Sequence, residues 1–208
     1  MKFQNALIAA LVALLAVLSC PAAHATERLL ILGDSLSDAY GMPRESGWSA
    51  LLQDRLGDQM EVINASISGE TTAGGLTRIE GLLNQHEPER LLVILGGNDG
   101  LRALNPSQVE RNLQGIIDHA LQADTEVALM QVRLPPNLGP AYLRRFEGIY
   151  PRLAEINQLT LFPFFLEGVF DQPGMMMDDG IHPSAAAQGL MLDALWPALA
   201  QWLDVESG

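Results

Sequence analysis

The residues best suited to chemistry lie in four polar segments that each contain glycine. These segments are Gly33 to Ser35, Ser66 to Thr71, Gly96 to Gly100 and Asp178 to Pro183. In the last of them Asp179 precedes His182 by three residues, and Gly180 allows a tight turn between the two. A carboxylate in this position can accept a hydrogen bond from one imidazole nitrogen, which leaves the other nitrogen free to act as a base.

Ser35 is the candidate nucleophile for such a base. A serine hydroxyl becomes a useful nucleophile when an oriented base lies within hydrogen-bond reach, and the oxyanion that forms requires preorganised donors. The backbone N–H groups of Ser35 and Gly69 and the side-chain amide of Asn98 are suitable donors. Simpler roles remain open, because Ser35 and Asp179 can each cap a helix and Gly69 can merely turn the chain.

A metal site formed by Asp178, Asp179 and His182 is the alternative interpretation of the last segment. It lacks support elsewhere, because His86 and His119 lie in polar surroundings without ligand spacing, and zinc takes three or four well-placed groups. Other enzyme signatures are missing from the sequence. It contains no Gly-x-Ser-x-Gly, no Ser-x-x-Lys, no phosphate-binding glycine loop and no Gly-x-Gly-x-x-Gly fingerprint.

Alternating strands and helices are expected to position these segments. Apolar runs without strict alternation predict strands of a parallel sheet at Arg28 to Leu32, Val62 to Ala65, Leu91 to Leu95 and Val127 to Val132. Helical spacing predicts helices at Trp48 to Leu56, Leu76 to Leu83, Val109 to Leu121, Ala141 to Gln158 and Pro183 to Trp202.

Four details refine this pattern. Ser107 and Glu110 form a capping box for the third helix, and Gly148 and Pro151 are expected to bend or break the fourth. Pro183 is expected in the first turn of the last helix, and the internal proline of Thr160 to Phe165 would place a fifth strand at an edge. The order predicts one α/β domain over residues 26–208, with a mostly parallel sheet of about five strands whose carboxyl ends gather the polar segments.

The first 25 residues have the layout of a secretory signal peptide. Lys2 precedes an unbroken apolar run from Ala6 to Leu18, which is too short to span a membrane, and Ala23-His24-Ala25 resembles a cleavage site. Lipid attachment at Cys20 is the alternative. Cys20 is the single cysteine, so the exported domain is expected to have no disulfide.

The charge balance limits the possible partners. The chain has 25 acidic against 12 basic residues and a formal net charge of −13. Such a chain repels phosphate backbones and anionic lipid surfaces, which argues against nucleic-acid binding. A monomer is the expected state for one acidic domain of this size.

The four segments together resemble the GDSL-type or SGNH hydrolases. The matching blocks are GDSLS with Ser35, SISGET with Gly69, GGND with Asn98, and DGIHP with Asp179 and His182. The sequences VRLPPNLG (132–139) and PFFLEGVF (163–170) are similar to the branch of multifunctional acyl thioesterases, lysophospholipases and arylesterases.

The resemblance implies a flavodoxin-like three-layer α/β/α fold without a metal or organic cofactor. It implies Ser35 as nucleophile, His182 as general base and acid, and Asp179 as the residue that orients His182. Ser35 and Gly69 N–H and the Asn98 amide would form the oxyanion hole. The acyl groove would be lined by Leu101, Leu104, Leu134, Pro135 and Leu138.

The expected function is therefore that of an exported, periplasmic serine hydrolase acting on a small-molecule or lipid acyl ester. Two other functions stay open: a catalytically silent carbohydrate- or lipid-binding domain with the same fold, and a metal-dependent hydrolase. An intact Ser35, Asp179 and His182 set argues against the silent domain, because a binding domain needs no such combination. Chelator would abolish the activity of the metal-dependent enzyme.

Overall fold

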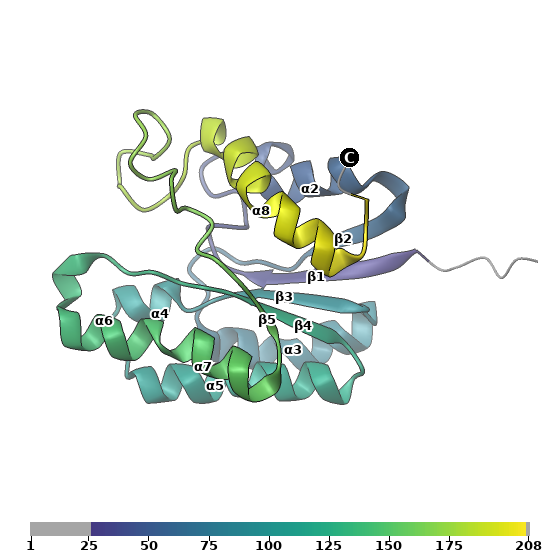
Figure 1. Ribbon diagram of the computed structural model, residues 1–208, viewed down its shortest axis with the longest axis horizontal. Helices are drawn as coiled ribbons and strands as arrows, with labels where there is room; N and C mark the ends of the chain where they lie inside the picture. Colours follow the sequence, from purple (N-terminus) through teal and green to yellow (C-terminus); the bar gives the residue numbers. More distant parts are fainter. Residues whose placement is uncertain (1–25, 207–208) are drawn as a thin grey trace, which may run out of the picture.

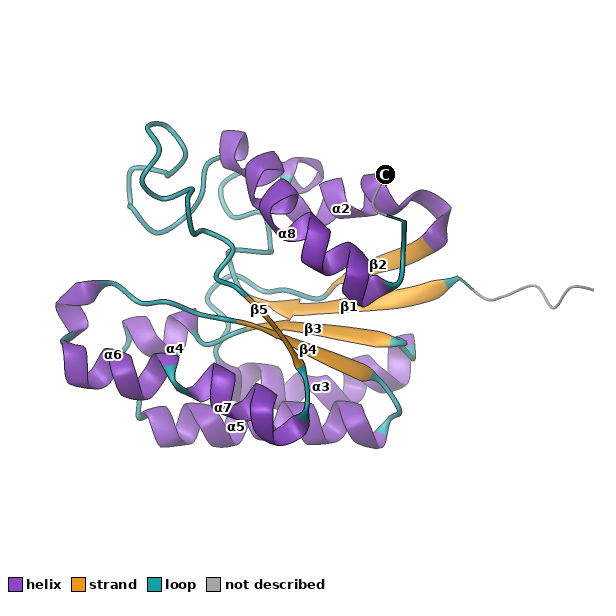
Figure 2. Ribbon diagram, viewed as in Figure 1, coloured by secondary structure: helices purple, strands orange, loops and turns teal. Residues whose placement is uncertain are grey.

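A five-stranded parallel sheet forms the centre of the protein in a computed structural model, which describes residues 26–206 (Figures 1 and 2). The strands are β1 (Glu27–Gly33), β2 (Met60–Asn64), β3 (Arg90–Ile94), β4 (Glu126–Met130) and β5 (Thr160–Phe162). Their order is β2-β1-β3-β4-β5, the flavodoxin-like order. The predicted signal peptide, with Cys20, lies outside the described residues.

Buried leucine and isoleucine side chains explain why β1 lies inside the sheet. Leu29 and Ile31 belong to the hydrophobic cluster on one face, and Leu30 and Leu32 belong to the cluster on the other face. All four side chains are fully buried. A strand with both faces covered has no polar alternation, which is why its sequence is a continuous apolar run.

Helices cover both faces of the sheet (Figure 2). On one face lie α2 (Trp48–Leu56) and α8 (Gln188–Leu203). The other face is covered by α3 (Thr72–His86), α5 (Pro106–Gln122), α6 (Pro140–Glu147) and α7 (Ile149–Asn157). The predicted α/β/α sandwich with about five parallel strands is confirmed. None of the helices in residues 26–206 is long and apolar enough to cross a membrane.

Several helix and strand ends differ from the sequence prediction. The cap of α5 is Asn105, whose side chain accepts from Ser107 N–H, because Pro106 already occupies the first helical position. The predicted fourth helix is broken at Gly148 into α6 and α7. The fifth strand lies at the sheet edge but ends at Phe162, one residue before the proline.

The last helix also starts later than predicted. Pro183 pairs with Met176 in an isolated antiparallel bridge, so it belongs to the preceding loop. A 3-10 turn over Ala185–Ala187 follows, and α8 begins at Gln188. The extra residues before the helix place His182 in a loop at the carboxyl end of the sheet.

The topology brings two of the polar segments together. From β1 the chain first adds β2 on one side, and then crosses to the other side of β1 to add β3, β4 and β5. The strand order therefore reverses between β1 and β3. Crevices for ligands form at such reversals, beyond the carboxyl ends of the strands. Ser35 follows β1, and Asn98 follows β3 in the short helix α4 (Gly97–Leu101).

Candidate active site

Ser35 lies in a single helical turn directly after β1, which we call the nucleophile turn (Asp34 to Asp38). The turn is closed by hydrogen bonds from Ser37 and Asp38 N–H to Asp34 O, both 3.0 Å long. Asp34 caps the turn, because its Oδ1 accepts from Leu36 N–H at 3.1 Å. The N–H of Ser35 donates to no acceptor within residues 26–206, so it is free to bind a ligand oxygen.

His182 lies in a second loop, the base segment (Met175 to Ser184). Met177 N–H donates to His182 O at 2.8 Å, and Ser184 N–H donates to Met175 O at 2.7 Å. These bonds make the two ends of the segment a short antiparallel ladder. The ladder holds the tight turn from Asp179 to His182 at its tip, where Gly180 adopts a positive φ of 67°.

The three predicted catalytic side chains form one continuous chain of hydrogen bonds. His182 Nε2 lies 2.8 Å from Ser35 Oγ, and His182 Nδ1 lies 2.7 Å from Asp179 Oδ2. The other carboxylate oxygen of Asp179 accepts from Ile181 N–H at 2.9 Å and from His182 N–H at 3.0 Å. This arrangement fixes the imidazole with Nδ1–H toward the carboxylate and Nε2 toward the hydroxyl.

The same hydrogen bonds determine the charge of Asp179. Donation from the backbone and side chain of His182 and from Ile181 N–H lowers the pKa of Asp179 from 3.8 to about 2. Its side chain is 40% exposed, so desolvation opposes this shift only weakly. Asp179 is therefore ionised at every pH at which the protein would work.

Tyr40 covers the other side of the imidazole. Its ring stacks on His182 with centroids 4.2 Å apart and an interplanar angle of 29°. Tyr40 is 46% exposed, so the stack forms part of the outer surface of the site. This contact was not predicted, because nothing in the sequence places Tyr40 beside a residue 142 positions further along the chain.

Gly69 lies in a tight turn that is attached to the nucleophile turn. Ile67 N–H donates to Gly33 O at 3.2 Å, and both the N–H and the hydroxyl of Ser68 donate to Asp38 Oδ2. Gly69 has φ of +80°, a conformation that favours glycine. Its N–H has no acceptor among the described residues, so it remains available as a donor.

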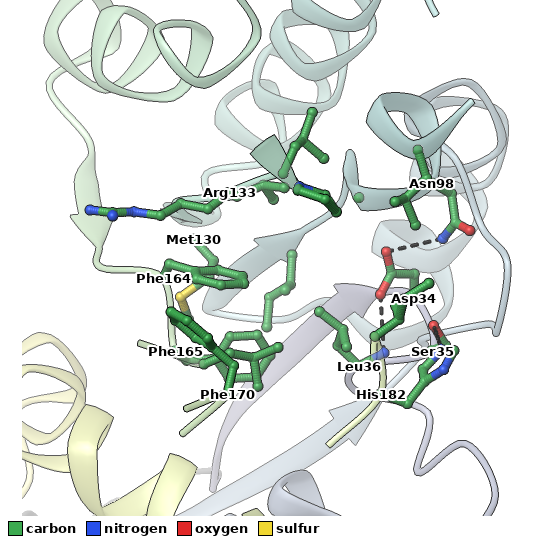
Figure 3. Close-up of a pocket in the computed structure, with 18 of the residues that line it drawn as sticks. Asp34, Ser35, Leu36, Asn98, Met130, Arg133, Phe164, Phe165, Phe170 and His182 are labelled. Atoms are coloured by element: carbon green, nitrogen blue, oxygen red, sulfur yellow. Dashed lines mark hydrogen bonds between the residues drawn. The ribbon is translucent and has the colours of Figure 1, made fainter. Parts of the chain in front are cut away.

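Asn98 occupies the second position of α4. The helix begins after Gly96, whose φ of +119° and close approach to the Tyr150 hydroxyl leave no room for a side chain. Asn98 Nδ2 donates to Asp34 Oδ2 at 3.2 Å (Figure 3). A primary amide has a second N–H, so Asn98 can donate to a ligand oxygen while it keeps this bond.

Asp34 is a functional candidate that the sequence did not reveal. Its side chain is 3% exposed, and burial raises its pKa from 3.8 to about 6 despite the hydrogen bonds from Leu36 and Asn98. The carboxylate lies between the nucleophile turn and α4. Asp34, the first residue after β1, is thus tied to Asn98 in α4 after β3.

A second buried aspartate holds the Gly69 turn against α4. Asp99 accepts from the N–H and hydroxyl of Thr72, at 2.9 Å and 2.6 Å. Thr72 Oγ1 in turn accepts from Asn112 Nδ2 of α5 at 3.0 Å. Arg102 Nη2 donates to Gly69 O at 3.3 Å. These bonds fix the position of the Gly69 turn relative to Asn98.

An apolar cavity of about 570 Å³ opens beside Ser35 and His182 (Figure 3). Of the predicted lining residues, Leu101, Leu134 and Pro135 lie in its wall. Leu104 and Leu138 do not: Leu104 is 41% exposed, and Leu138 packs against the core beneath α5 and α6. The cavity has the size and apolar lining typical of small-molecule sites.

The opposite wall of the cavity was not predicted. It comes mainly from the loop after β5 and from the base segment, and its apolar residues are Phe164, Phe165, Leu166, Phe170 and Met176. The signal was present in the sequence, since β5 also ends at the carboxyl edge and an apolar, phenylalanine-rich stretch follows it. In residues 26–206 no group of three or more His, Cys, Asp or Glu side chains is placed to hold a metal ion.

Comparison with known proteins gives consistent matches over most of the chain. The profile of the GDSL-like Lipase/Acylhydrolase family matches residues 31–190. Esterase TesA of Pseudomonas aeruginosa is 46% identical over 178 residues, which cover 84% of this chain and 89% of that protein. Thioesterase 1/protease 1/lysophospholipase L1 of Escherichia coli K12 is 45% identical over 203 residues, covering 98% of this chain and 94% of that protein.

Solved structures agree with the observed fold. The crystal structure of TesA superposes with a TM-score of 0.80 at 46% identity and covers 84% of this chain and 99% of that one. The psychrotrophic esterase EstA from Pseudoalteromonas, solved with monoethylphosphonate as inhibitor, has a TM-score of 0.83 at 38% identity. That match covers 86% of this chain and 99% of the EstA chain.

Proposed function

The chain belongs to the GDSL-like lipase/acylhydrolase family and is an ester or thioester hydrolase; on this basis, we propose that it uses Ser35 as nucleophile and passes through an acyl-enzyme. The observation that carries the proposal is the unbroken chain of contacts from Ser35 Oγ through His182 to Asp179, with both links under 3 Å. Relatives named arylesterase, thioesterase and lysophospholipase support acyl esters and thioesters as the substrate class.

The first half of the reaction forms the acyl-enzyme. Ser35 Oγ attacks the acyl carbon while His182 Nε2 takes the hydroxyl proton. Asp179 keeps the imidazole in the correct tautomer and stabilises the imidazolium. The tetrahedral intermediate then collapses: the bond between the acyl carbon and the leaving group breaks, and His182 gives its proton to the departing oxygen or sulfur.

The second half releases the acid. A water molecule takes the place of the leaving group, and His182 Nε2 accepts a proton from it as it attacks the acyl carbon. Collapse of the second tetrahedral intermediate breaks the bond to Ser35 Oγ, which recovers its proton from His182. The carboxylic acid leaves and the enzyme returns to its starting state.

Three N–H donors stabilise the oxyanion in both halves. They are the free backbone N–H groups of Ser35 and Gly69 and the second N–H of the Asn98 amide. The hydrogen bonds from Ile67 N–H to Gly33 O and from Ser68 N–H to the Asp38 carboxylate hold these donors in place before substrate binds. Preorganised donors of this kind usually supply the largest share of transition-state stabilisation.

The acyl chain occupies the cavity between Leu134 and the loop after β5. This wall is apolar, whereas the side of Ser35 toward Tyr40 and Ile67 is open to solvent. The leaving group therefore departs on the open side. An open leaving-group side accommodates an aryl, thiol or glycerophosphate group without a specific contact for any one of them.

The first test is hydrolysis of p-nitrophenyl butyrate by residues 26–208, with Ser35→Ala as the control and with chelator present. We expect turnover that resists chelator and falls by about 10⁴-fold or more in the variant. Activity that chelator removes would contradict the serine mechanism and favour a metal-dependent one. Full activity in Ser35→Ala would exclude Ser35 as the nucleophile.

Export is the second part of the proposal, supported by the composition of residues 1–25. Expression of the whole chain in a Gram-negative host should place the activity in the periplasmic fraction with a new terminus at Thr26. A cytoplasmic protein with an intact start at Met1 would contradict it. Acylation at Cys20 would instead place the protein in the membrane fraction.

A further inference from the structure

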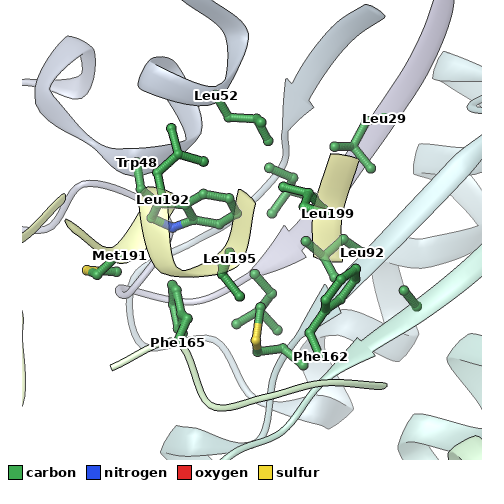
Figure 4. Packing of buried hydrophobic residues seen from close by; sticks show 14 of the residues in the cluster. Leu29, Trp48, Leu52, Leu92, Phe162, Phe165, Met191, Leu192, Leu195 and Leu199 are labelled. Atoms are coloured by element: carbon green, nitrogen blue, oxygen red, sulfur yellow. The ribbon is translucent and has the colours of Figure 1, made fainter. Parts of the chain in front are cut away.

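One buried tryptophan contacts the nucleophile turn, the wall of the acyl cavity and the first residue of α8. Trp48, the first residue of α2, is fully buried. Its indole Nε1–H donates to Leu36 O in the nucleophile turn at 3.2 Å. Its backbone N–H donates to Gln188 Oε1 at 3.0 Å. Its ring packs edge-on against Phe165, a wall of the acyl cavity, with centroids 5.7 Å apart (Figure 4).

Gln188 completes the connection to the base segment. It is 2% exposed, begins α8, and donates from Nε2 to Ser184 O at 3.3 Å. Ser184 follows His182 by two residues and closes the ladder of the base segment through its bond to Met175. A line of hydrogen bonds thus runs from the nucleophile turn through Trp48 and Gln188 to the loop that holds His182.

We propose that Trp48 and Gln188 are positioning residues that hold the nucleophile turn and the base segment at the separation that catalysis by Ser35 and His182 requires. This inference rests on the proposed function. Ser35 and His182 are 147 positions apart in sequence and belong to different loops, so their contact depends on how those loops are anchored. A misplacement of about 1 Å in such a pair can cost about 100-fold in rate.

The bond between Ser35 Oγ and His182 Nε2 is only partly buried, and it joins two loops. The Asp179 side chain is 40% exposed, and residues 178–181, which form the turn directly before His182, are open to solvent. The Trp48 and Gln188 side chains are themselves buried, and the hydrogen bond that joins the two residues is buried with them, where it is protected from competing water. Buried polar side chains that each bond a backbone group fix the distance between the segments they join.

Trp202 shows that burial in this cluster does not itself require a hydrogen bond from the indole. Trp202 belongs to the same hydrophobic cluster as Trp48 and is 8% exposed. Its ring packs edge-on against Phe162 at 5.7 Å, the same geometry as Trp48 against Phe165. Its Nε1–H has no partner among the described residues. Trp202 is thus a matched control for the Trp48 indole bond.

The test compares Trp48→Phe with Trp202→Phe, using p-nitrophenyl butyrate kinetics and thermal unfolding, beside wild type and Ser35→Ala. Both variants keep an aromatic ring and lose similar volume, so both should lower the midpoint of unfolding. We expect Trp48→Phe to lose about ten-fold in kcat with little change in KM. The reason is that the nucleophile turn and the base segment no longer keep their separation, while the acyl cavity that binds substrate remains. Trp202→Phe should keep kcat within about two-fold.

Gln188→Met provides a second variant that does not depend on the Trp48 ring. It should also lower kcat about ten-fold, and the double variant Trp48→Phe/Gln188→Met should lose less than the product of the two single losses, because both interrupt one connection. The inference would be overturned if a folded Gln188→Met had wild-type kcat. It would also be overturned if Trp48→Phe and Trp202→Phe had equal kcat. In either case, a wild type that is more active than Ser35→Ala would still support the proposed function. An inert wild type would overturn both.

Discussion

Two aspartates lie on opposite sides of Ser35 and experience opposite environments. Asp179 is exposed at the tip of the base segment, and hydrogen bonds lower its pKa to about 2. Asp34 is the buried first residue of the nucleophile turn, and desolvation raises its pKa to about 6. Asp179 contacts the imidazole directly, whereas Asp34 contacts the amide of Asn98.

In the proposed mechanism, this difference suits the two aspartates to two different tasks in one site. A carboxylate that orients and stabilises an imidazolium must stay ionised. Hydrogen-bond donors keep it ionised by lowering its pKa, and they do so without burying it. A carboxylate that must hold an amide in place benefits from a rigid, water-free surrounding and tolerates a higher pKa. Substitutions on the two sides should therefore differ in size and in pH dependence.

The largest effect is expected for Asp179→Asn. Loss of the carboxylate removes the acceptor that sets the imidazole tautomer, so turnover of p-nitrophenyl butyrate should fall by about 10⁴-fold. Asp178→Asn is the matched control, since Asp178 is the exposed neighbour and makes no side-chain hydrogen bond within residues 26–206. If Asp178→Asn were the damaging change, the assignment of the orienting residue would be wrong.

Asn98→Ala should have the next largest effect. Removal of one oxyanion donor typically lowers turnover by about 10²- to 10³-fold, and KM should change little because the donor acts mainly in the transition state. Circular dichroism and thermal unfolding serve as the check that the fold is intact. Wild-type turnover in a folded Asn98→Ala would exclude the amide from the oxyanion hole.

Asp34→Asn should reduce turnover about ten-fold, because the new amide can accept only through its oxygen and so loses one of the bonds from Asn98 and Leu36.

A separate readout for Asp34 is the pH dependence of the free energy of unfolding. The folded state raises the pKa of Asp34, so the folded protein binds the proton more tightly than the unfolded chain does. Asp34 therefore makes the free energy of unfolding fall as pH rises from about 4 to about 6, by about 3 kcal/mol in total.

Urea unfolding at pH 4, 5, 6 and 7 measures this contribution. The free energy of unfolding of Asp34→Asn minus that of wild type should increase with pH over this range, since the variant has no carboxyl to deprotonate. A difference that stays constant from pH 4 to 7 would show that burial does not shift the pKa of Asp34. Asp179, whose pKa is lowered from 3.8 to about 2, should stabilise the fold fully above about pH 4 and lose that contribution only as pH falls below about 4.

The smallest effect is expected in the cavity. Phe170 lines it but is 50% exposed, so Phe170→Ala should leave stability nearly unchanged. It should lower kcat/KM for p-nitrophenyl octanoate about five-fold and leave the acetate ester unaffected, because only the longer chain reaches that wall. Leu104→Ala is the control, since Leu104 is similarly exposed but lies outside the cavity wall. Equal effects of the two variants would place the acyl chain elsewhere.

Much of the fold was predictable from the sequence. The apolar runs indicated all five strands, and the helical spacing indicated the longer helices but not the short α4, because strands buried on both faces and amphipathic helices leave distinct patterns. The ends were less predictable. Asn105 as a cap and the late start of α8 at Gln188 depend on which of several polar residues reaches a free backbone N–H or a neighbouring loop.

The candidate site was predictable only in part. The sequence indicated Ser35, Gly69, Asn98, Asp179 and His182 as candidates because each lies in a short motif with its own chemistry, and the structure places Ser35, Asp179 and His182 in contact. Contacts between distant segments left no such motif, so the stack of Tyr40 on His182 and the bridge from Trp48 to Gln188 were missed. The role of Asp34 was also missed, because its burial and its bond to Asn98 become visible only in the fold.

The most direct test of the central claim is to trap the nucleophile. Residues 26–208 would be inactivated with p-nitrophenyl ethylphosphonate, digested, and mapped by mass spectrometry, with Ser35→Ala treated in parallel. We predict one phosphonyl group per chain, located on Ser35, appearing in proportion to the loss of esterase activity, and no labelling of the variant. Labelling at another residue, or equal labelling of Ser35→Ala, would contradict the assignment of Ser35 as the catalytic nucleophile.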